Sequence, residues 1–253
     1  MSFSATVSKF RESANTGVVL GTRCVYGRVE TIAAMARGGV DYIYLDQQHG
    51  LVSTEAIAVA VATVDRYGVA LLIRVPDQSS ASIGKALDAG AHGVIVPDVE
   101  DVEQGRRAVA ATQYPPNGTR SWGTFSLDVE GYSLSPDQAG RPLCFPMIES
   151  PRGVTNAPAI ASLDGVDGLY VGRFDLALTM GTVLGDFGAP GSHSDATQMI
   201  RRACDDAEVL MGTTGKPTEL LAQGYRMQTV GSELDLLSVG LTASLGREQS
   251  AHD

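Results

Sequence analysis

The sequence predicts a (β/α)₈ barrel that forms a single domain over residues 1–253, with its core at roughly residues 17–245. About eight short apolar runs recur along the chain, and most are separated by segments with helical periodicity. This alternation indicates a parallel sheet, because parallel strands need a crossover connection between them. About eight such units in roughly 250 residues match the size of this barrel. A doubly wound open sheet is the alternative, but no GxGxxG motif follows the first predicted strand.

The predicted strands are apolar runs suited to a sheet that is covered on both faces. They are residues 16–25, 41–46, 69–75, 93–99, 142–150, 168–174, 209–214 and 225–232. Four predicted helices have good helix formers, and several close on glycine: residues 29–39, 54–68, 80–91 and 101–113. Residues 114–142 form a long irregular stretch rich in Pro, Gly, Ser and Tyr. A loop of this length usually covers a site or contacts another subunit.

Composition excludes several classes of protein. The formal charge is −10, and the acidic residues are spread along the chain without any charged block, so nucleic acid and anionic membranes are poor partners. Cys24, Cys144 and Cys204 form no CxxC pair and are odd in number, which favours a reducing compartment over disulfides or a zinc site. The first residues lack the apolar segment of a signal peptide. We therefore expect a cytoplasmic protein.

Polar residues recur where the predicted strands end. They are Asp46 and His49, Arg74, Glu149, and Asp175. In a barrel these ends converge on one mouth, where enzymes of this fold keep their chemistry. Glu149 and Asp175 follow neighbouring strands and would repel each other unless a positive charge lay between them. A hard divalent cation with oxygen ligands meets this need, and two protein ligands leave positions open for a substrate.

Taken singly, each of these residues has a structural alternative. Asp175 alone is better explained as a helix N-cap, Glu149 could pair with Arg152 or Arg173, Arg74 with Asp77, and His49 could be a turn residue. Cys144 and Met147 are expected to fill the core, and His193 and His252 to be solvated. The combination at the strand ends is what favours a site.

An ordered set of motifs resembles the HpcH/HpaI aldolase family, the class II metal-dependent pyruvate aldolases built on a (β/α)₈ barrel. The motifs are DQQHG, LLIRVP, ALDAGAHGVIVPDVE, PMIES and GVDGLYVGRFDLALTMG, and the resemblance extends over roughly residues 21–240. It implies carbon–carbon lyase activity on 4-hydroxy-2-oxo acids, with pyruvate and an aldehyde as small-molecule substrates. It also implies a homo-oligomer, a hexamer in the family, in which the last helix, here residues 232–248, is exchanged between barrels.

The resemblance also implies a role for each site residue. Glu149 and Asp175 would bind Mg²⁺, Mn²⁺ or Co²⁺, Arg74 would stabilise the enolate oxygen, and His49 would be the base, acting through bound water. Asp46 would hold that water or the histidine, and Asp88 would reach the histidine of a neighbouring subunit. The backbone amides of Gly172, Arg173, Phe174 and Asp175, at the start of a helix, would receive the pyruvate carboxylate.

Three positions depart from the family pattern. Gln48 stands where Glu is common, Arg173 stands where Pro is frequent, and Met147 stands where some members have Gln. These changes leave in place the residues expected to bind the metal and to stabilise the enolate. They bear instead on which aldehyde is the acceptor and on which reaction is catalysed.

Two other activities, one other aldolase mechanism and one non-catalytic role compete with the metal-dependent aldolase. Oxaloacetate decarboxylation would use the same enolate, so it is the nearest alternative. A lysine Schiff base could replace the metal, but Lys9, Lys85 and Lys216 are the whole lysine set. Lys9 in the N-terminal tail and Lys85 in a predicted helix are not placed to enter the mouth, so Lys216, just past the seventh strand, is the only candidate, and its exposed setting is poorly suited to this chemistry. A phosphate-handling isomerase would need a glycine-rich anion site at the last two strands, where the sequence instead places acidic residues. A non-catalytic barrel that binds a partner would not need this set of polar residues.

Overall fold

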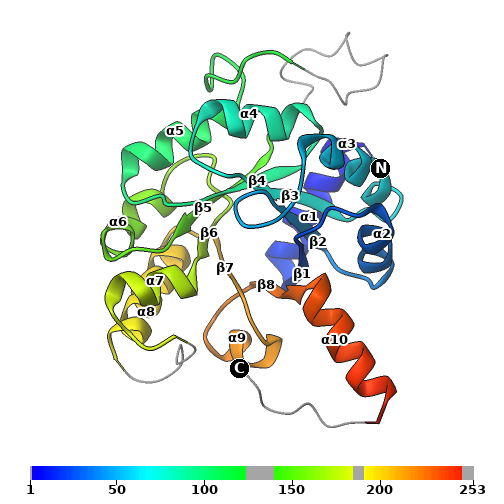
Figure 1. Cartoon of the computed structure of the whole chain (residues 1–253). Coiled ribbons are helices and arrows are strands. Elements are labelled where there is room, and N and C mark those ends of the chain that lie inside the picture. The colour runs from blue at the N-terminus through cyan, green and yellow to red at the C-terminus, as the bar shows by residue number, and fades with distance from the viewer. Residues whose placement is uncertain (1, 124–139, 185–190, 247–253) are drawn as a thin grey trace.

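The structure is a closed barrel of eight parallel strands, each hydrogen-bonded to its neighbours in chain order (Figure 1). It is a computed structural model that describes residues 2–123, 140–184 and 191–246. The strands are β1 (Val19–Cys24), β2 (Tyr42–Asp46), β3 (Ala70–Arg74), β4 (Gly93–Val96), β5 (Leu143–Ile148), β6 (Gly168–Val171), β7 (Leu210–Thr214) and β8 (Met227–Ser232). All eight lie within the predicted strand segments, so the predicted fold class is confirmed.

Helices surround the barrel (Figure 1). They are α1 (Phe3–Thr16), α2 (Val29–Arg37), α3 (Thr54–Val64), α4 (Ser80–Asp88), α5 (Val102–Thr112), α6 (Pro151–Ala161), α7 (Arg173–Met180), α8 (Ser192–Asp206), α9 (Pro217–Ala222) and α10 (Glu233–Ser244). Several begin at a side-chain cap, such as Ser53 before α3 and Ser232 before α10. Within the described ranges, no helix is long and apolar enough to span a bilayer.

Alternation along the strands divides their side chains between two apolar layers. One layer packs between the strands and the outer helices, and the other fills the interior of the barrel. On β2, for example, Ile43 and Leu45 face the helices, whereas Tyr42 and Tyr44 face inward. The next inward position on each strand, at its carboxyl end, therefore opens into the mouth.

The barrel interior below the mouth holds a chain of hydroxyl groups. Tyr42 and Tyr170 both hydrogen-bond to the hydroxyl of Thr229, at 2.7 and 2.8 Å, and Tyr170 also contacts Thr214 at 2.9 Å. On β1, Gly21 leaves the space that the Tyr42 ring occupies, because a Cβ at this position would collide with the ring. These contacts fill the barrel and give the site above it a rigid support.

Helix α1 closes the amino end of the barrel. Val7, Phe10 and Ala14 are buried, and the Phe10 ring lies 6.0 Å from the rings of both Tyr42 and Phe145. The predicted core, roughly residues 17–245, left this segment out, and that boundary is wrong. Its apolar residues are few, but their spacing places them on one face of a helix, and that face packs into the open end of the barrel.

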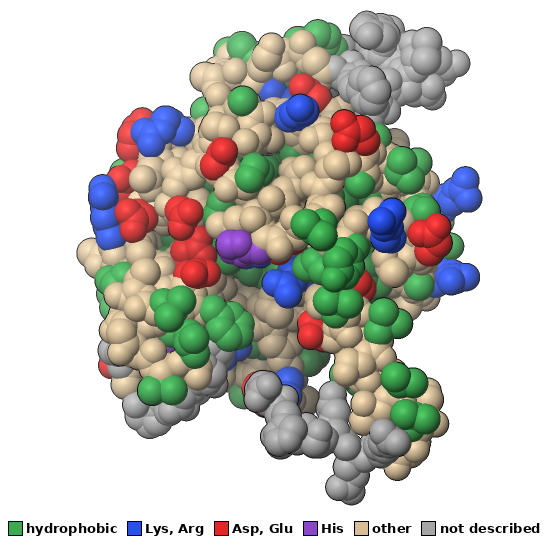
Figure 2. All heavy atoms as spheres, viewed as in Figure 1, with side chains coloured by type: hydrophobic (Ala, Val, Ile, Leu, Met, Phe, Trp, Pro, Cys, Tyr) green, Lys and Arg blue, Asp and Glu red, His purple; other side chains and the backbone are tan. Residues whose placement is uncertain are grey.

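Helix α10 extends away from the barrel (Figure 1), and Figure 2 shows hydrophobic side chains exposed along it. Leu237, Leu241 and Leu245 are 65%, 62% and 54% exposed. A helix that leaves this many leucines in water buries little of its own surface, so the single chain gives it little stabilisation.

Candidate active site

Four charged side chains occupy inward positions at the carboxyl ends of the strands. Arg23 comes from β1, Asp46 from β2 and Arg74 from β3, and Glu149 directly follows β5. Figure 2 shows acidic, basic and histidine side chains gathered around the centre of this face. The sequence analysis had identified three of the four and had missed Arg23.

Asp46 and Arg74 form a two-point ion pair inside the mouth. The strand register places them side by side, the Nε of Arg74 donates to Asp46 Oδ1 at 2.9 Å, and its Nη2 donates to Oδ2. Asp46 is fully buried and Arg74 is 6% exposed. Burial raises the pKa of Asp46, but the hydrogen bonds and charge of Arg74 outweigh it and hold this pKa below its usual value. The ion pair therefore holds the Arg74 guanidinium in one orientation. Arg74 pairs with Asp46 and not with Asp77, the alternative partner considered from the sequence.

Asp46 also holds the loop that carries His49. Its Oδ1 accepts hydrogen bonds from the backbone N–H groups of Gln48 and His49, both at 3.1 Å. The His49 side chain is exposed at the mouth. One buried carboxylate thus fixes both the guanidinium and the backbone of the histidine loop.

Glu149 is a buried carboxylate on the opposite side of the barrel. It is 5% exposed, and its Oε1 accepts a hydrogen bond from the backbone N–H of Asp98 at 2.8 Å. Burial, together with the negative charges of Asp98 and Asp175, raises the pKa of Glu149 to about 7, although the charge of Arg74 opposes the shift. An ionised Glu149 therefore needs a cation close by.

Helix α7 begins directly against Glu149. Gly172 is its N-cap, and a Cβ at this position would collide with the side chains of Glu149 and Met147. Asp175 lies exposed in the first turn, beyond the cap position, so the N-cap alternative for this residue is wrong. The first backbone N–H groups of any helix lack partners within it, so this helix start presents donors beside the two carboxylates.

Two of the predicted substrate-binding residues are oriented differently from Asp175. The guanidinium of Arg173 is mostly buried and turns toward β7, where its Nη1 lies 3.4 Å from the carbonyl oxygen of Thr214. Burial lowers the pKa of Arg173. The Phe174 side chain is 58% exposed. The backbone of both residues lies at the start of α7, but the Arg173 side chain turns toward β7 and the Phe174 side chain is exposed to solvent.

Asp88 lies outside the mouth, at the end of α4. It forms an ion pair with Arg120 at 2.8 Å, and the Arg120 guanidinium lies 4.6 Å from the centre of the Tyr114 ring. The structure therefore does not bring Asp88 to the site of its own chain. Residues 124–139, most of the predicted long loop, lie outside the described residues.

Several structural alternatives are resolved by the contacts. Arg152 pairs with Asp101 at 2.6 Å rather than with Glu149. Cys144 and Met147 lie in the core as expected, but His193 is 5% exposed, so its predicted solvation is wrong. His193 lies on α8, a helix that the sequence analysis did not assign. His252 lies outside the described residues.

The donor set fits a divalent cation. Glu149 and Asp175 offer carboxylate oxygens, and the pKa of Glu149 is raised first by burial and then by the negative charges of Asp98 and Asp175, effects that a cation would offset. Within residues 2–123, 140–184 and 191–246, no group of three or more His, Cys, Asp or Glu side chains is placed to hold a metal. A metal at this site would therefore have two protein ligands, which leaves open positions for a substrate.

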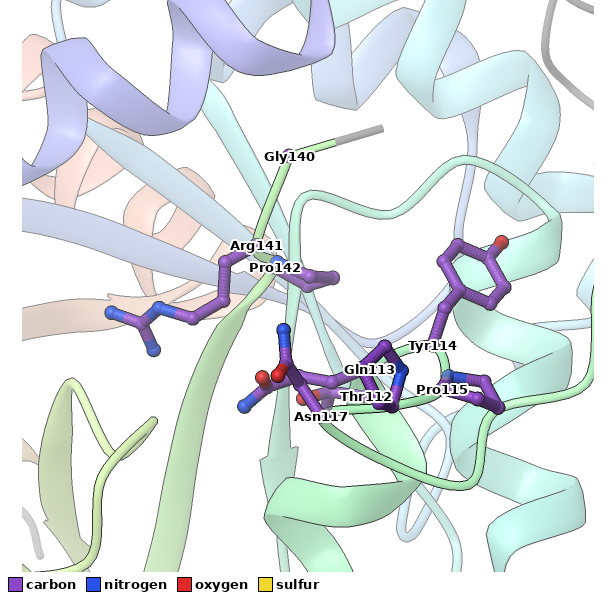
Figure 3. A pocket seen from close by; sticks show the side chains of 9 residues that line it. Thr112, Gln113, Tyr114, Pro115, Asn117, Gly140, Arg141 and Pro142 are labelled. Atoms are coloured by element: carbon purple, nitrogen blue, oxygen red, sulfur yellow. The ribbon is translucent and has the colours of Figure 1, made fainter. Parts of the chain in front are cut away.

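A pocket of about 530 Å³ lies at the opposite end of the barrel from the mouth (Figure 3). Its walls come from the end of α5, the following Pro115 and Pro116, and Arg141 before β5. It is remote from the strand ends that carry Glu149 and Arg74.

The fold and the site define a class: a (β/α)₈ barrel whose buried charged groups meet at the carboxyl ends of its strands, the face that enzymes of this fold use. The chain belongs to the HpcH/HpaI aldolase/citrate lyase family, which it matches over residues 28–239. The family and the names of its relatives indicate an aldolase.

Three similar proteins illustrate the relationship. The chain is 30% identical to the 4-hydroxy-2-oxo-heptane-1,7-dioate aldolase of Klebsiella pneumoniae, over 84% of this chain and 83% of that protein. It is 32% identical to the hydroxypyruvate/pyruvate aldolase of Chromohalobacter salexigens, over 85% and 83% of the two chains. A crystal structure of a family protein from Burkholderia cenocepacia aligns with a TM-score of 0.83 and 25% identity, covering 96% of this chain and 98% of that chain.

Proposed function

We propose that this protein is a divalent-metal-dependent aldolase that forms or cleaves 4-hydroxy-2-oxo acids through the enolate of pyruvate. The observation that carries the proposal is the Asp46–Arg74 ion pair, which faces a buried Glu149 whose pKa is raised to about 7. Two relatives whose names specify a 4-hydroxy-2-oxo acid and pyruvate support the substrate class.

Glu149 and Asp175 would hold Mg²⁺, Mn²⁺ or Co²⁺. When bound, the cation withdraws electron density from the keto group of pyruvate and so acidifies the methyl group. The N–H groups at the start of α7, from Arg173 to Asp175, would receive the pyruvate carboxylate. This arrangement would direct the methyl group away from α7 and toward β2 and β3.

Arg74 would stabilise the enolate oxygen. Its Nε and Nη2 bind Asp46, which leaves Nη1 as the donor for an oxyanion. Because the ion pair fixes the guanidinium in advance, little reorganisation is needed as charge develops. His49, on the loop that Asp46 holds, would take the methyl proton through a water molecule and later return it.

Exchange of the pyruvate methyl protons with deuterated water tests this function most directly. We expect this exchange to require a divalent cation and to need no aldehyde. The measurement is the loss of the methyl signal of pyruvate in proton NMR. Exchange together with faster turnover of oxaloacetate than of any aldol would make oxaloacetate decarboxylation the main activity. Absence of exchange with all three cations would exclude the enolate chemistry and favour a non-catalytic barrel.

Glu149→Gln is predicted to stabilise the metal-free protein at high pH. The raised pKa means that the fold favours protonated Glu149, so ionisation costs stability as pH rises from 4.5 through about 7. Glutamine keeps an acceptor for the Asp98 N–H and carries no charge. At pH 8 we expect a melting temperature higher by on the order of 5 °C, with no gain at pH 4, and loss of stabilisation by Mn²⁺.

Glu12→Gln is the matched control, because Glu12 is exposed on α1, far from the mouth. It should change neither the melting temperature at pH 8 nor the response to Mn²⁺. A Glu149→Gln protein that melts lower at pH 8, yet still responds to Mn²⁺, would contradict both the electrostatic account and the assigned ligand.

We also propose that the protein is a homo-oligomer in which α10 packs against a second copy. The exposed leucines of α10 supply the apolar surface for such an interface. The resemblance to the family implies a hexamer, in which Asp88 would lie beside the His49 of a neighbouring subunit.

A complementation experiment tests this shared site. Asp88→Asn and His49→Ala are each expected to be inactive. In randomly mixed oligomers, about a quarter of the sites would combine an intact Asp88 with an intact His49, so activity should recover to about that fraction. The measurement is aldol turnover after subunit exchange, with each variant alone as control. Mixed oligomers that form without any recovery would show that Asp88 serves its own chain, through Arg120.

A further inference from the structure

A cavity of about 230 Å³ lies at the amino end of the barrel, between α1 and the segments that lead into β5, β6, β7 and β8. It is at the opposite end of the strands from Glu149 and Arg74. Three of the residues that line it are arginines, Arg11, Arg141 and Arg226. The chain as a whole has a formal charge of −10, so this group of positive charges stands out against the overall charge of the protein.

Asp167 brings two of these guanidinium groups together. Its Oδ1 accepts hydrogen bonds from the Nε of Arg11 at 2.8 Å and from the Nη2 of Arg141 at 3.0 Å. Its Oδ2 accepts from the backbone N–H of Cys144 at 3.0 Å, and the Asp167 side chain is only 8% exposed. One carboxylate therefore holds two arginines side by side and offsets only one of their two positive charges.

Arg226 supplies the third guanidinium, from the position just before β8. Its Nη2 donates to the backbone carbonyl oxygen of Ala14 and lies 3.5 Å from that of Gly17, at the end of α1. Among the described residues, neither the Nη1 of Arg11 nor the Nη1 of Arg226 donates to a protein acceptor. The Arg11 side chain is 31% exposed and Arg226 is exposed, so both guanidinium groups are open to a ligand from solvent.

Glu208 is the second acidic residue that lines the cavity. It is exposed to solvent, so water screens its charge more than the charge of a buried group. Three positive and two negative formal charges thus surround the cavity, and Asp167 is already shared by two of the arginines. The balance favours an anion as the ligand.

We propose that this cavity binds a phosphate group, either as free phosphate or as the terminal group of a small phosphomonoester. Guanidinium groups from three separate segments surround it, which suits a tetrahedral dianion with several oxygens better than a planar carboxylate. The site is independent of the proposed aldol chemistry, because it lies at the end of the barrel that α1 closes.

A bound phosphate would join α1 to two strands. Arg11 lies on α1, whereas Arg141 and Arg226 come shortly before β5 and β8. A ligand held by all three would therefore clamp the helix whose Phe10 packs into the barrel. Because such a ligand binds the folded chain only, the melting temperature should rise with its concentration, and amide hydrogen exchange in α1 should become slower.

Isothermal titration calorimetry tests this site on the full chain, with EDTA present so that no metal at the mouth competes for the ligand. Inorganic phosphate and glycerol 3-phosphate are titrated separately, and we expect binding at the cavity by one or both. Tighter binding of glycerol 3-phosphate would identify a phosphomonoester as the ligand, and tighter binding of phosphate would identify the free ion. Hydrogen exchange in α1 is measured with and without the tighter ligand.

Two substitutions should change the affinity in opposite directions. Arg226→Gln should weaken binding by roughly 10-fold or more, the range for loss of a charge-assisted hydrogen bond. Glu208→Gln should strengthen binding by about 2- to 5-fold, because it removes an exposed opposing charge. Arg226 also holds the end of α1, so if Arg226→Gln fails to fold, the gain in Glu208→Gln decides the question.

Arg202→Gln is the matched control, because Arg202 is exposed on α8 and does not line the cavity. Arg23→Met removes a guanidinium from the mouth instead. Both variants should bind phosphate like the unchanged protein. Binding that is weakened by Arg23→Met and not by Arg226→Gln would place the phosphate at the mouth. That result overturns the inference, as does absence of binding by both ligands or an unchanged affinity in both Arg226→Gln and Glu208→Gln.

Discussion

Removal of the divalent cation is expected to abolish pyruvate aldol activity, and Mg²⁺, Mn²⁺ or Co²⁺ should restore it. Glu149→Ala or Asp175→Ala should have the effect of a chelator, because each would remove one of the two proposed protein ligands. The measurement is aldol turnover before and after EDTA treatment and metal addition, with metal content determined in parallel. A loss of at least about 10³-fold is expected, since on the proposed mechanism the cation would acidify the substrate and orient it.

A Schiff base on a lysine is the alternative to the metal, and it predicts the opposite result of these experiments. Lys216 is 82% exposed at its side chain and pairs with Glu219 at 3.6 Å, so its amine lies in solvent and not in a buried pocket. Lys216→Ala should therefore retain activity, and borohydride added with pyruvate should trap no adduct. Full turnover in the chelated protein, together with an adduct on Lys216, would refute the assignment of a metal.

Arg74→Lys is expected to lower kcat by roughly 10²-fold or more while folding and Mn²⁺ affinity are kept. A lysine ammonium cannot bind both oxygens of Asp46 and also present a fixed donor to the enolate. The measurement is kcat for aldol cleavage, with a Mn²⁺ titration and a melting curve on the same preparation.

Arg37→Lys is the control for this exchange, because Arg37 is exposed at the end of α2. The kcat of Arg37→Lys for aldol cleavage should equal that of the unchanged protein. Unchanged kcat in Arg74→Lys would mean that the ion pair with Asp46 is structural and that another group stabilises the oxyanion.

The strands could be predicted from the sequence because parallel strands in this fold are buried on both faces and therefore appear as continuous apolar runs. Helix α1 could not be recognised in the same way. Its buried residues are few, and what stabilises it is the open end of a barrel built from distant strands. Local sequence carries the strand signal, whereas α1 depends on tertiary packing.

Most residues of the site could be predicted from the sequence, but the contacts between them were harder to predict. Glu149 and Arg74 stand out because a charged residue ends an apolar run. The partner of Arg74 depends on the register between β2 and β3, which places Asp46 beside it, and no local pattern specifies that register. Arg23 was missed because its run also contains threonine and cysteine, so one more polar residue gave no contrast. Its alternation with Val19 and Gly21 was the signal that could have identified it.

The closed amino end of the barrel has a consequence for the order of events in catalysis. Phe10 and its neighbours on α1 seal that end, so the mouth is where ligands enter and leave the site that the described residues form. Pyruvate, held against α7 and the buried Arg74, would lie deeper than an acceptor beside the exposed His49. The aldehyde would then have to arrive second in synthesis and depart first in cleavage. On this account, the stacking of two ligands in a mouth whose floor is filled by side chains imposes a compulsory sequence of binding and release.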